Sequence, residues 1–325
     1  MTYEQMIQTE CTDNQYDAWT DYRREITDYI IDSVQNYYRR RKIVSEKILR
    51  ISKEYGMKQV IDENLKKPVL AIWGAGGGND MDLPRLAKYF RLVLIDRDTE
   101  LLKRTVKRFG LDEKMCACVD LSFWDISHDD YKMIEAMLKD DVPDAGIMKY
   151  IEELVQSIHR PDYSKLPHFD FSVCVGVASQ LNVRLSMLMT FYGRTNQLAE
   201  YMHILNKEAV EQLWRAVDVL TNNMIIYGYE IRDIGTDNMI QTEMTVRDEI
   251  YEINQDYEDW LEQPVWPPYD LYTTIAGNEH LTEKLTKAIA AEQVVARQFK
   301  TFFWPFTDLK AYVMVFGSFE MLKNQ

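Results

Sequence analysis

The sequence predicts an α/β fold with a doubly wound, mostly parallel sheet of seven strands and a C-terminal antiparallel hairpin. Between residues 68 and 231, short apolar runs alternate with stretches of helical periodicity, which is typical of parallel strands joined by helices. A glycine-rich segment at 74–78 separates the first of these strands from the helix that follows. Two β-rich runs near the C-terminus are joined by a short turn at Thr307 and Asp308.

The N-terminal segment, 1–66, has the pattern of a long helix from residue 14 to about 62. Its apolar side chains recur at spacings of three and four: Trp19, Tyr22, Ile26, Tyr29, Ile30, Val34 and Tyr37. Gly56, a residue type that favours helix ends, lies near its C-terminal end. We expect 1–66 to form a helical lid over the rest of the chain.

The segment 67–232 carries the alternation and is predicted to be the core domain. Its expected strands lie at 68–73, 92–96, 114–120, 169–181 and 223–231. Helices are expected at 80–90 and 99–110, through most of 121–168, and from the fourth strand to about 221. Pro84 fits only in the first turn of its helix.

The segment 233–296 interrupts this rhythm. It is acidic and aromatic and contains many turn formers, so we interpret it as an insertion that caps a substrate pocket. The remaining segment, 297–325, is predicted to be the hairpin that completes the sheet.

Charge and composition restrict the partners. The chain has 38 Lys and Arg against 52 Asp and Glu, a net charge of -14, which disfavours nucleic acid as a partner. No Cys-x-x-Cys pair occurs, and no histidine has a partner at helical or strand spacing, so no metal site is predicted. The N-terminus resembles no signal peptide and no run is long enough for a membrane span, so we expect a cytoplasmic protein.

The glycine-rich loop predicts a ligand close to the backbone, because unpaired amide groups at a helix N-terminus attract polar and anionic groups. Its glycines follow the pattern G-x-G-x-G at Gly74, Gly76 and Gly78. A dinucleotide loop would place a glycine at Asn79, and a phosphate-binding P-loop would continue with Gly-Lys-Ser or Gly-Lys-Thr. Neither pattern is present.

Two acidic residues at the ends of the next strands sharpen this prediction. Asp96 ends the second strand about twenty residues after the loop, where a carboxylate can accept both hydroxyls of a ribose. Asp120 ends the third strand, where a carboxylate can accept from the exocyclic amine of an adenine. The carboxyl ends of parallel strands share one sheet edge, so the loop and both acids indicate one nucleoside-binding site.

These segments resemble the class I, Rossmann-like S-adenosylmethionine-dependent methyltransferases. The loop segment WGAGGGNDMDL is similar to their first motif, LVLIDRD to their second, and CACVDLSFWD to their adenine-binding motif. The resemblance covers roughly 69–235 and the hairpin near 298–320. It implies S-adenosyl-L-methionine as cofactor. A lid and an insertion around the site would enclose a pocket, so we expect the methyl acceptor to be an O or N atom of a small molecule, a natural product or a peptide.

The resemblance also implies a set of cofactor-binding residues. The loop and the two residues after it would lie near the methionine part, Asp96 at the ribose, Asp120 and Leu121 around the adenine, and the end of the fourth strand near the methyl group. The full set is Gly74, Ala75, Gly76, Gly78, Asn79, Asp80, Asp96, Arg97, Asp120, Leu121, Val175, Gly176 and Gln180. One position departs from the family, since Ile72 stands where an acidic residue is usual.

The catalytic group is not identified by a motif. Methyl transfer to a nucleophile depends largely on positioning, and a base is required only where the nucleophile starts protonated. His203, on a helix after the fourth strand, and Tyr22, on the N-terminal helix, are the candidates. Three other functions stay open: an NAD(P)-dependent oxidoreductase, a non-catalytic S-adenosylmethionine-binding module, and an RNA methyltransferase.

Overall fold

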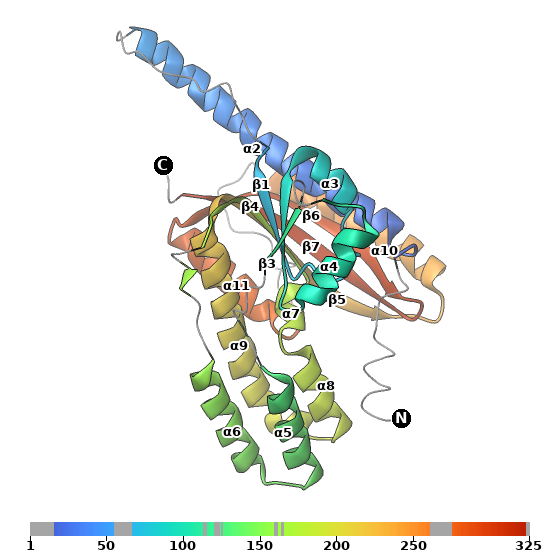
Figure 1. Ribbon diagram of the computed structural model, residues 1–325. Coiled ribbons are helices and arrows are strands. Elements are labelled where there is room, and N and C mark those ends of the chain that lie inside the picture. The colour runs from blue at the N-terminus through green and yellow to red at the C-terminus, as the bar shows by residue number, and fades with distance from the viewer. Residues whose placement is uncertain are drawn as a thin grey trace.

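A seven-stranded sheet forms the centre of the protein (Figure 1). The computed structural model describes residues 16–54, 67–112, 116–119, 124, 126–158, 162–163, 166–260 and 275–322. In this part of the chain the strand order is β3-β2-β1-β4-β5-β7-β6. The strands are β1 (Val69–Trp73), β2 (Arg91–Ile95), β3 (Cys116–Val119), β4 (Phe169–Val175), β5 (Thr221–Gly235), β6 (Val294–Thr307) and β7 (Lys310–Met321).

The strand directions confirm the predicted doubly wound sheet. Strands β1 to β5 pair in parallel, whereas β7 pairs antiparallel with both β5 and β6. Only β7 is therefore reversed, and β6 runs in the direction of the first five strands. The order changes direction between β1 and β4, and ligands of open α/β sheets bind at such a switch point, beyond the carboxyl ends of the strands.

The described helices cover both faces of this sheet. They are α2 (Thr20–Glu54), α3 (Leu83–Tyr89), α4 (Thr99–Arg108), α5 (His128–Lys139), α6 (Asp144–Ser157), α7 (Val177–Gln180), α8 (Val183–Phe191), α9 (Thr195–Leu220), α10 (Met239–Trp260) and α11 (Asn278–Ala290). Asp82 caps α3 and places Pro84 in its first turn, as predicted. Helices α5, α6, α8 and α9 extend together beyond the sheet (Figure 1).

Alternation along β1 divides the core into two layers. Leu70 and Ile72 join a buried cluster with α2, α3 and α4. Ala71 and Trp73 point to the other face and join a cluster with the helices from α5 to α9 and with α11. Successive side chains of a strand point to opposite faces, so a strand covered on both sides is apolar throughout.

Helix α2 belongs to the first of these layers. Trp19, Tyr22, Ile26 and Ile30 are almost fully buried in it. The hydroxyl of Tyr29 donates to the carbonyl of Gln298 at 2.9 Å, which ties the helix to β6. Over this stretch α2 therefore packs as a structural layer on the sheet, and Trp19, the residue before the helix, reaches the cavity described below.

The described part of 233–296 contains the end of β5, the helices α10 and α11, and the start of β6. Helix α10 packs on the β6–β7 hairpin, where the side-chain amide of Asn254 pairs with the backbone of Thr301 at 2.7 and 3.1 Å. Val246 and Ile250 add an apolar contact with Phe303. Helix α11 packs in the layer with α9. The cap role expected for 233–296 stays a prediction, and residues 261–274 lie outside the described residues.

The hairpin closes at a two-residue turn, Asp308 and Leu309, between the paired residues Thr307 and Lys310. Within the residues described, no helix combines the length and apolar character that crossing a membrane requires.

Candidate functional site

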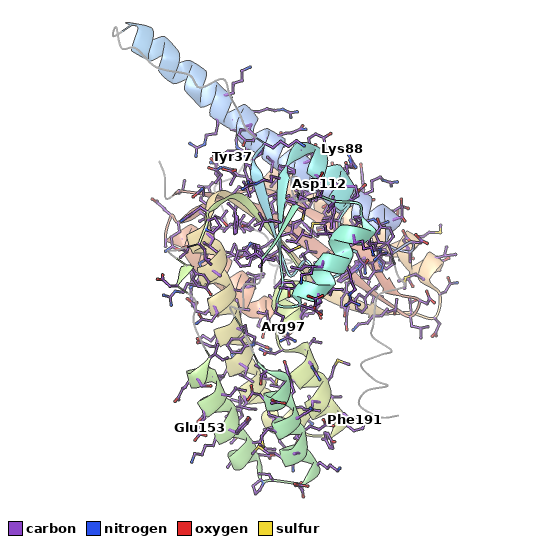
Figure 2. All side chains as sticks on the ribbon, viewed as in Figure 1. Tyr37, Lys88, Arg97, Asp112, Glu153 and Phe191 are labelled. Atoms are coloured by element: carbon purple, nitrogen blue, oxygen red, sulfur yellow. The ribbon has the colours of Figure 1, made fainter. Side chains whose placement is uncertain are left out.

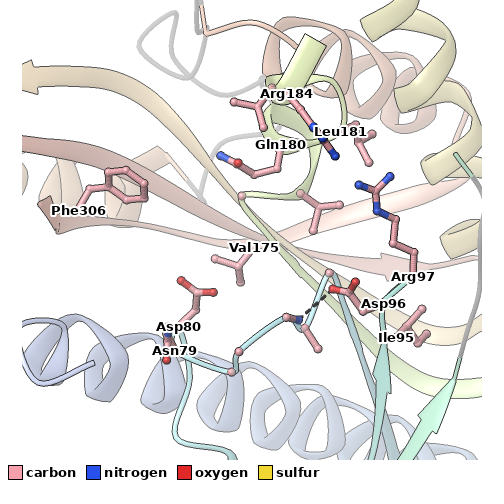
Figure 3. Close-up of a pocket in the computed structure, with 18 of the residues that line it drawn as sticks. Asn79, Asp80, Ile95, Asp96, Arg97, Val175, Gln180, Leu181, Arg184 and Phe306 are labelled. Carbon is pink, nitrogen blue, oxygen red and sulfur yellow. Dashed lines mark hydrogen bonds between the residues drawn. The ribbon is translucent and has the colours of Figure 1, made fainter. Parts of the chain in front are cut away.

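A cavity of about 440 Å³ opens beyond the carboxyl ends of β1, β2 and β4 (Figure 3). This volume lies within the range of small-molecule sites, about 300–1,000 Å³. Most of the predicted cofactor residues line it: Gly74, Ala75, Gly76, Gly78, Asn79, Asp80, Asp96, Arg97, Val175, Gly176 and Gln180. The predicted adenine residues Asp120 and Leu121 lie outside the described residues.

The glycine loop forms the floor of this cavity. Gly74, Gly76 and Gly78 have φ values of +64°, +46° and +67°. Only glycine adopts this left-handed conformation at little cost, which explains the alternating G-x-G-x-G pattern. The amide of Gly76 donates to the Asp96 carboxylate at 3.0 Å, so the loop is fixed to the end of β2.

Asp96 presents its carboxylate at the edge of the cavity (Figure 3). One oxygen accepts from the amide of Gly76 and the other from the amide of Asp98, both at 3.0 Å. Each carboxylate oxygen can accept further hydrogen bonds, so a diol could still be recognised. Arg97 follows on the same loop, and Figure 2 places it where the sheet meets the extended helices.

Asp80 and Glu230 form a pair of carboxylates at the other end of the loop. Asp80 lines the cavity, and Glu230 is buried on β5. The pKa of Asp80 is raised to about 7, first because burial disfavours the charge and then because of the nearby Glu230 carboxylate. The Arg23 guanidinium acts in the opposite direction. Asp80 is therefore poised to change protonation when a cation approaches.

Glu230 is held by hydrogen bonds from two elements that border the site. The Ser179 hydroxyl donates to one carboxylate oxygen at 3.0 Å, and the side-chain amide of Asn278 donates to the other at 2.7 Å. Gly176 has φ +63°, and a Cβ there would lie 3.3 Å from the same carboxylate. These contacts fix the turn after β4, where the methyl group was expected.

The side chain of Asn79 turns toward α4, although the residue also lines the cavity. The side-chain amide oxygen of Asn79 accepts a hydrogen bond from Arg108 at 3.1 Å. The backbone carbonyl of Asn79 accepts one from Arg23 of α2 at 3.4 Å. Arg23 in turn stacks on the ring of Tyr16 at 3.5 Å. Helix α2 is thereby joined to the end of the glycine loop.

Sequence reasoning missed the aromatic and helical walls of the cavity. These residues are Trp124, Tyr131, Leu181, Val183, Arg184, Trp304 and Phe306. The hairpin aromatics had a signal: Phe302, Trp304 and Phe306 alternate along β6 and therefore share one face. Arg184 and Gln180 lie across the cavity from Asp80 and Asp96 in Figure 3.

Trp19, in the turn just before α2, completes the aromatic wall. Its ring packs edge-on against Trp304 at 5.0 Å and stacks on Phe306 at 6.0 Å. Its indole nitrogen donates to the Phe306 carbonyl at 3.3 Å. Segments almost 290 residues apart in the chain thus form one surface of the cavity.

The two candidates for a base lie outside the lining of the cavity. The hydroxyl of Tyr22 is buried without a hydrogen-bond partner among the described residues. Burial, with the Asp80 and Glu230 carboxylates, raises the pKa of Tyr22 well above its ordinary value, so the phenol stays protonated and suits donation better than base catalysis. His203 instead contacts His280, with ring centroids 4.4 Å apart.

Ile72, the departure from the family pattern, is buried under α2. An acidic side chain there would enter an apolar layer without a partner, which costs several kcal/mol, on the order of a buried unpaired charge. Asp80 is the carboxylate that faces the cavity from the loop itself.

Comparisons with known proteins give structural likenesses. No protein-family model and no curated protein matches the sequence. A solved S-adenosylmethionine-dependent methyltransferase from Clostridium acetobutylicum is 9% identical, with 98% of each chain covered and a TM-score of 0.41. The N-methyltransferase NodS from Bradyrhizobium japonicum, in complex with S-adenosyl-L-homocysteine, is 11% identical, with 78% of each chain covered and a TM-score of 0.34.

A third solved structure, an S-adenosylmethionine-dependent methyltransferase from Methanosarcina mazei, is 11% identical and has a TM-score of 0.36. The match covers 82% of this chain and 98% of that one. These identities and TM-scores describe a structural likeness only. The fold class is assigned from the strand order and strand directions of the sheet. The doubly wound, mostly parallel sheet of seven strands, with β7 reversed near the C-terminus, is the Rossmann-like α/β fold class that the sequence predicts.

Proposed function

We propose that this protein is an S-adenosylmethionine-dependent methyltransferase. The observation that carries the proposal is the cavity at the switch point, where the glycine loop, Asp96 and Asp80 meet. Asp96 suits a ribose diol at one end of the loop, and Asp80 suits an ammonium group at the other. A ligand with a nucleoside at one end and an amino acid at the other matches this order.

In this proposal Asp80 supplies the carboxylate that the family usually has at the position of Ile72. Its carboxylate would pair with the ammonium group of the cofactor, and this positive charge would offset the repulsion from Glu230. The proton that Asp80 holds near neutral pH would leave as the cofactor binds. We therefore expect cofactor affinity to rise with pH through about 7, the pKa of Asp80 in the ligand-free protein.

The acceptor would lie against the aromatic wall of Trp19, Trp304 and Phe306. Large flat side chains bury apolar or aromatic groups well, and the cavity size suits a small molecule, a natural product or a single peptide side chain. The cofactor supplies a sulfonium methyl, and an O or N atom of the acceptor would attack it. The wall and the turn after β4 would contribute by holding the two reactants in line.

Binding of S-adenosylhomocysteine tests the proposal, with Asp96→Asn as the variant and Asp248→Asn as its control. Asp248 is an exposed residue of α10, outside the cavity lining. Loss of a charged acceptor for ribose hydroxyls costs about 1.5–3 kcal/mol, or about 10- to 100-fold in affinity. Calorimetry should show this loss for Asp96→Asn and unchanged affinity for Asp248→Asn.

The rival functions predict different results in binding and methyl-transfer assays. If S-adenosylhomocysteine fails to bind the wild-type protein while NAD(P) binds, the protein is an oxidoreductase and the proposal is wrong. If S-adenosylhomocysteine binds but no labelled methyl group is transferred to any component of a cell extract, a non-catalytic binding module is the better description. Salt-dependent RNA binding would indicate an RNA methyltransferase.

A further inference from the structure

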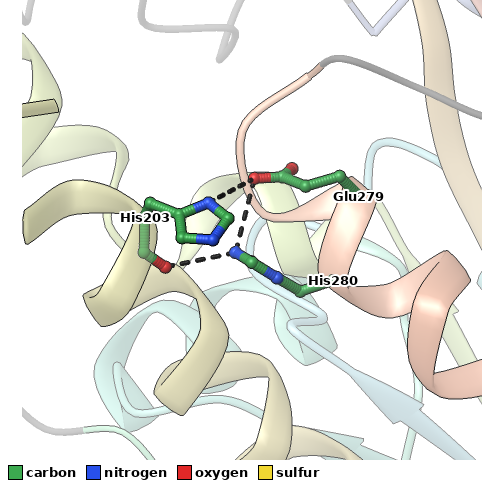
Figure 4. A group of neighbouring side chains, drawn as sticks. All are labelled: His203, Glu279 and His280. Atoms are coloured by element: carbon green, nitrogen blue, oxygen red, sulfur yellow. Dashed lines mark hydrogen bonds and ion pairs between the residues drawn. The ribbon is translucent and has the colours of Figure 1, made fainter. Parts of the chain in front are cut away.

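Three potential metal ligands meet between two helices, away from the cavity. His203 comes from α9, and Glu279 and His280 come from the first turn of α11 (Figure 4). Each offers one ligand atom, and these atoms all lie within 4.8 Å of one another. Among the described residues this is the group of three that could hold a metal ion. None of the three lines the cavity.

The distances between these atoms suit a tetrahedral ion of the zinc type. Zinc binds nitrogen and carboxylate oxygen at about 2.0–2.2 Å, so two ligands at tetrahedral positions lie about 3.3–3.6 Å apart. His280 Nε2 lies 3.4 Å from Glu279 Oε1, which already has this spacing. His203 Nδ1 lies 3.9 Å from the same oxygen, and a small side-chain rotation would close the difference.

Glu279 also carries a buried oxygen that needs a partner. Its Oε2 is buried and has no hydrogen-bond partner among the described residues. The N-terminus of α11 favours a negative charge in its first turn, which explains why an acidic residue is tolerated there. That field does not satisfy the lone pairs of Oε2, whereas a bound cation would neutralise the whole carboxylate.

Access and tautomer state are compatible with binding. The side chain of His203 is 60% exposed and that of His280 is 5% exposed, so the group opens to solvent on one side and a water could complete the coordination. His280 Nε2 lies 3.1 Å from the carbonyl of His203. A metal would replace this hydrogen bond, and the imidazole proton would reside on Nδ1, with no change in net charge on the ring.

We propose that His203, Glu279 and His280 bind a divalent transition-metal ion of the zinc class, which links α9 to α11. Two imidazoles and one carboxylate are borderline ligands that favour zinc over magnesium or calcium. The proposal departs from the expectation of no metal site, which rested on spacing within single elements. The helix contact it would reinforce lies next to Asn278, whose side chain holds Glu230 at the edge of the cavity.

Metal binding to the full chain tests this, with zinc and cobalt as the probes and magnesium as the comparison. His203→Ala is the principal variant, because the exposed side chain can be removed with little effect on packing. His168→Ala is its control, an exposed histidine outside the group. Equilibrium titration after treatment with a chelator gives affinity and stoichiometry, and the visible absorption of cobalt reports tetrahedral coordination.

We expect one zinc per chain in the wild-type protein and in His168→Ala. Affinity should fall by more than about 100-fold in His203→Ala, since loss of a group that only supports a ligand already costs about 10- to 100-fold. Glu279→Gln, which retains the shape of the side chain, should show a comparable loss. Zinc at about 100 times its Kd should raise the Tm by about 5 °C in the wild-type protein and leave His203→Ala unchanged.

Equal zinc affinity in the wild-type protein and His203→Ala would overturn the proposal, as would magnesium binding as tightly as zinc. Absence of the tetrahedral cobalt spectrum from a folded wild-type protein would also overturn it. Circular dichroism of each variant without metal confirms that it is folded. Binding of S-adenosylhomocysteine is a separate measurement, and its result does not bear on this site.

Discussion

Replacement of Asp80 by asparagine gives the sharpest test of the electrostatics of the site. Asp80 lines the cavity beside the buried Glu230, and its pKa is raised to about 7, by burial first and by Glu230 second. The variant Asp80→Asn keeps the shape of the side chain and removes both the titration and the repulsion. Two properties should change: the pH dependence of stability and the affinity for the cofactor.

The direction of the pH dependence of stability follows from whether the folded or the unfolded state binds the Asp80 proton more tightly. Asp80 has a pKa of about 7 in the folded protein, against 3.8 for an ordinary aspartate in water, so the folded state holds the proton over this interval. The free energy of unfolding is therefore highest below the lower value, falls as pH rises to about 7, and is constant above it. A pKa difference of about three corresponds to about 4 kcal/mol, an upper value because Asp80 is partly open to the cavity.

Urea unfolding of the wild-type protein and Asp80→Asn, between about pH 5 and pH 8, measures this effect. Other titrating groups cancel in the difference between the two proteins. The free energy of unfolding of Asp80→Asn relative to wild type should increase by up to about 1.4 kcal/mol for each pH unit up to about pH 7 and then level off. Asp248→Asn, an exposed substitution on α10, should show a flat difference.

The reasoning would be refuted by a flat difference between wild type and Asp80→Asn across this range. A difference with the opposite slope would mean that the carboxylate is stabilised as an anion, with Arg23 outweighing burial and Glu230. In the same variant, S-adenosylhomocysteine should bind about 10- to 100-fold more weakly at pH 8, because its ammonium group loses a charged partner. Unchanged affinity there would place the ammonium group elsewhere.

Two further substitutions test the loop and the aromatic wall. Gly78→Ala should be less stable than Gly193→Ala by about 1–3 kcal/mol in urea unfolding, because both positions have positive φ but only a Cβ at 78 meets other side chains, at 2.8–3.0 Å. Equal losses would mean that the loop relaxes without cost. Trp19→Ala should lower stability by about 3–5 kcal/mol and weaken acceptor binding, whereas Trp19→Phe should retain most of both. A small loss for Trp19→Ala would show that α2 adjusts to fill the space.

The strands and the loop could be predicted from local sequence because their signals are local. A buried parallel strand needs a continuous apolar run, and a loop with three left-handed positions needs glycine at each of them. The order of Gly74, Gly76, Gly78 and Asp96 along the chain then fixes their place, since the ends of neighbouring parallel strands lie at one sheet edge. The predicted loop residues and Asp96 accordingly line one cavity.

The rest of the site depends on contacts between distant elements. Trp19 and Phe306 meet only because α2 packs on the face of the sheet that the hairpin extends. Burial, together with the approach of Glu230, raises the pKa of Asp80 to about 7, and neither effect has a signal in the spacing of the two residues. Periodicity describes one element at a time, so it could not find either contact.

By itself, then, the sequence determined the α/β sheet, the C-terminal antiparallel hairpin and the glycine loop with its acidic residue, because each is encoded within a few neighbouring residues. Only the tertiary structure decided that Ile72 is a core residue under α2 and that His203 faces Glu279 and His280. His203 lies on α9, and Glu279 and His280 lie on α11. These residues meet because both helices cover the same face of the sheet. The physical reason is that burial and pairwise electrostatics depend on distances in space, which the chain sets only after it has folded.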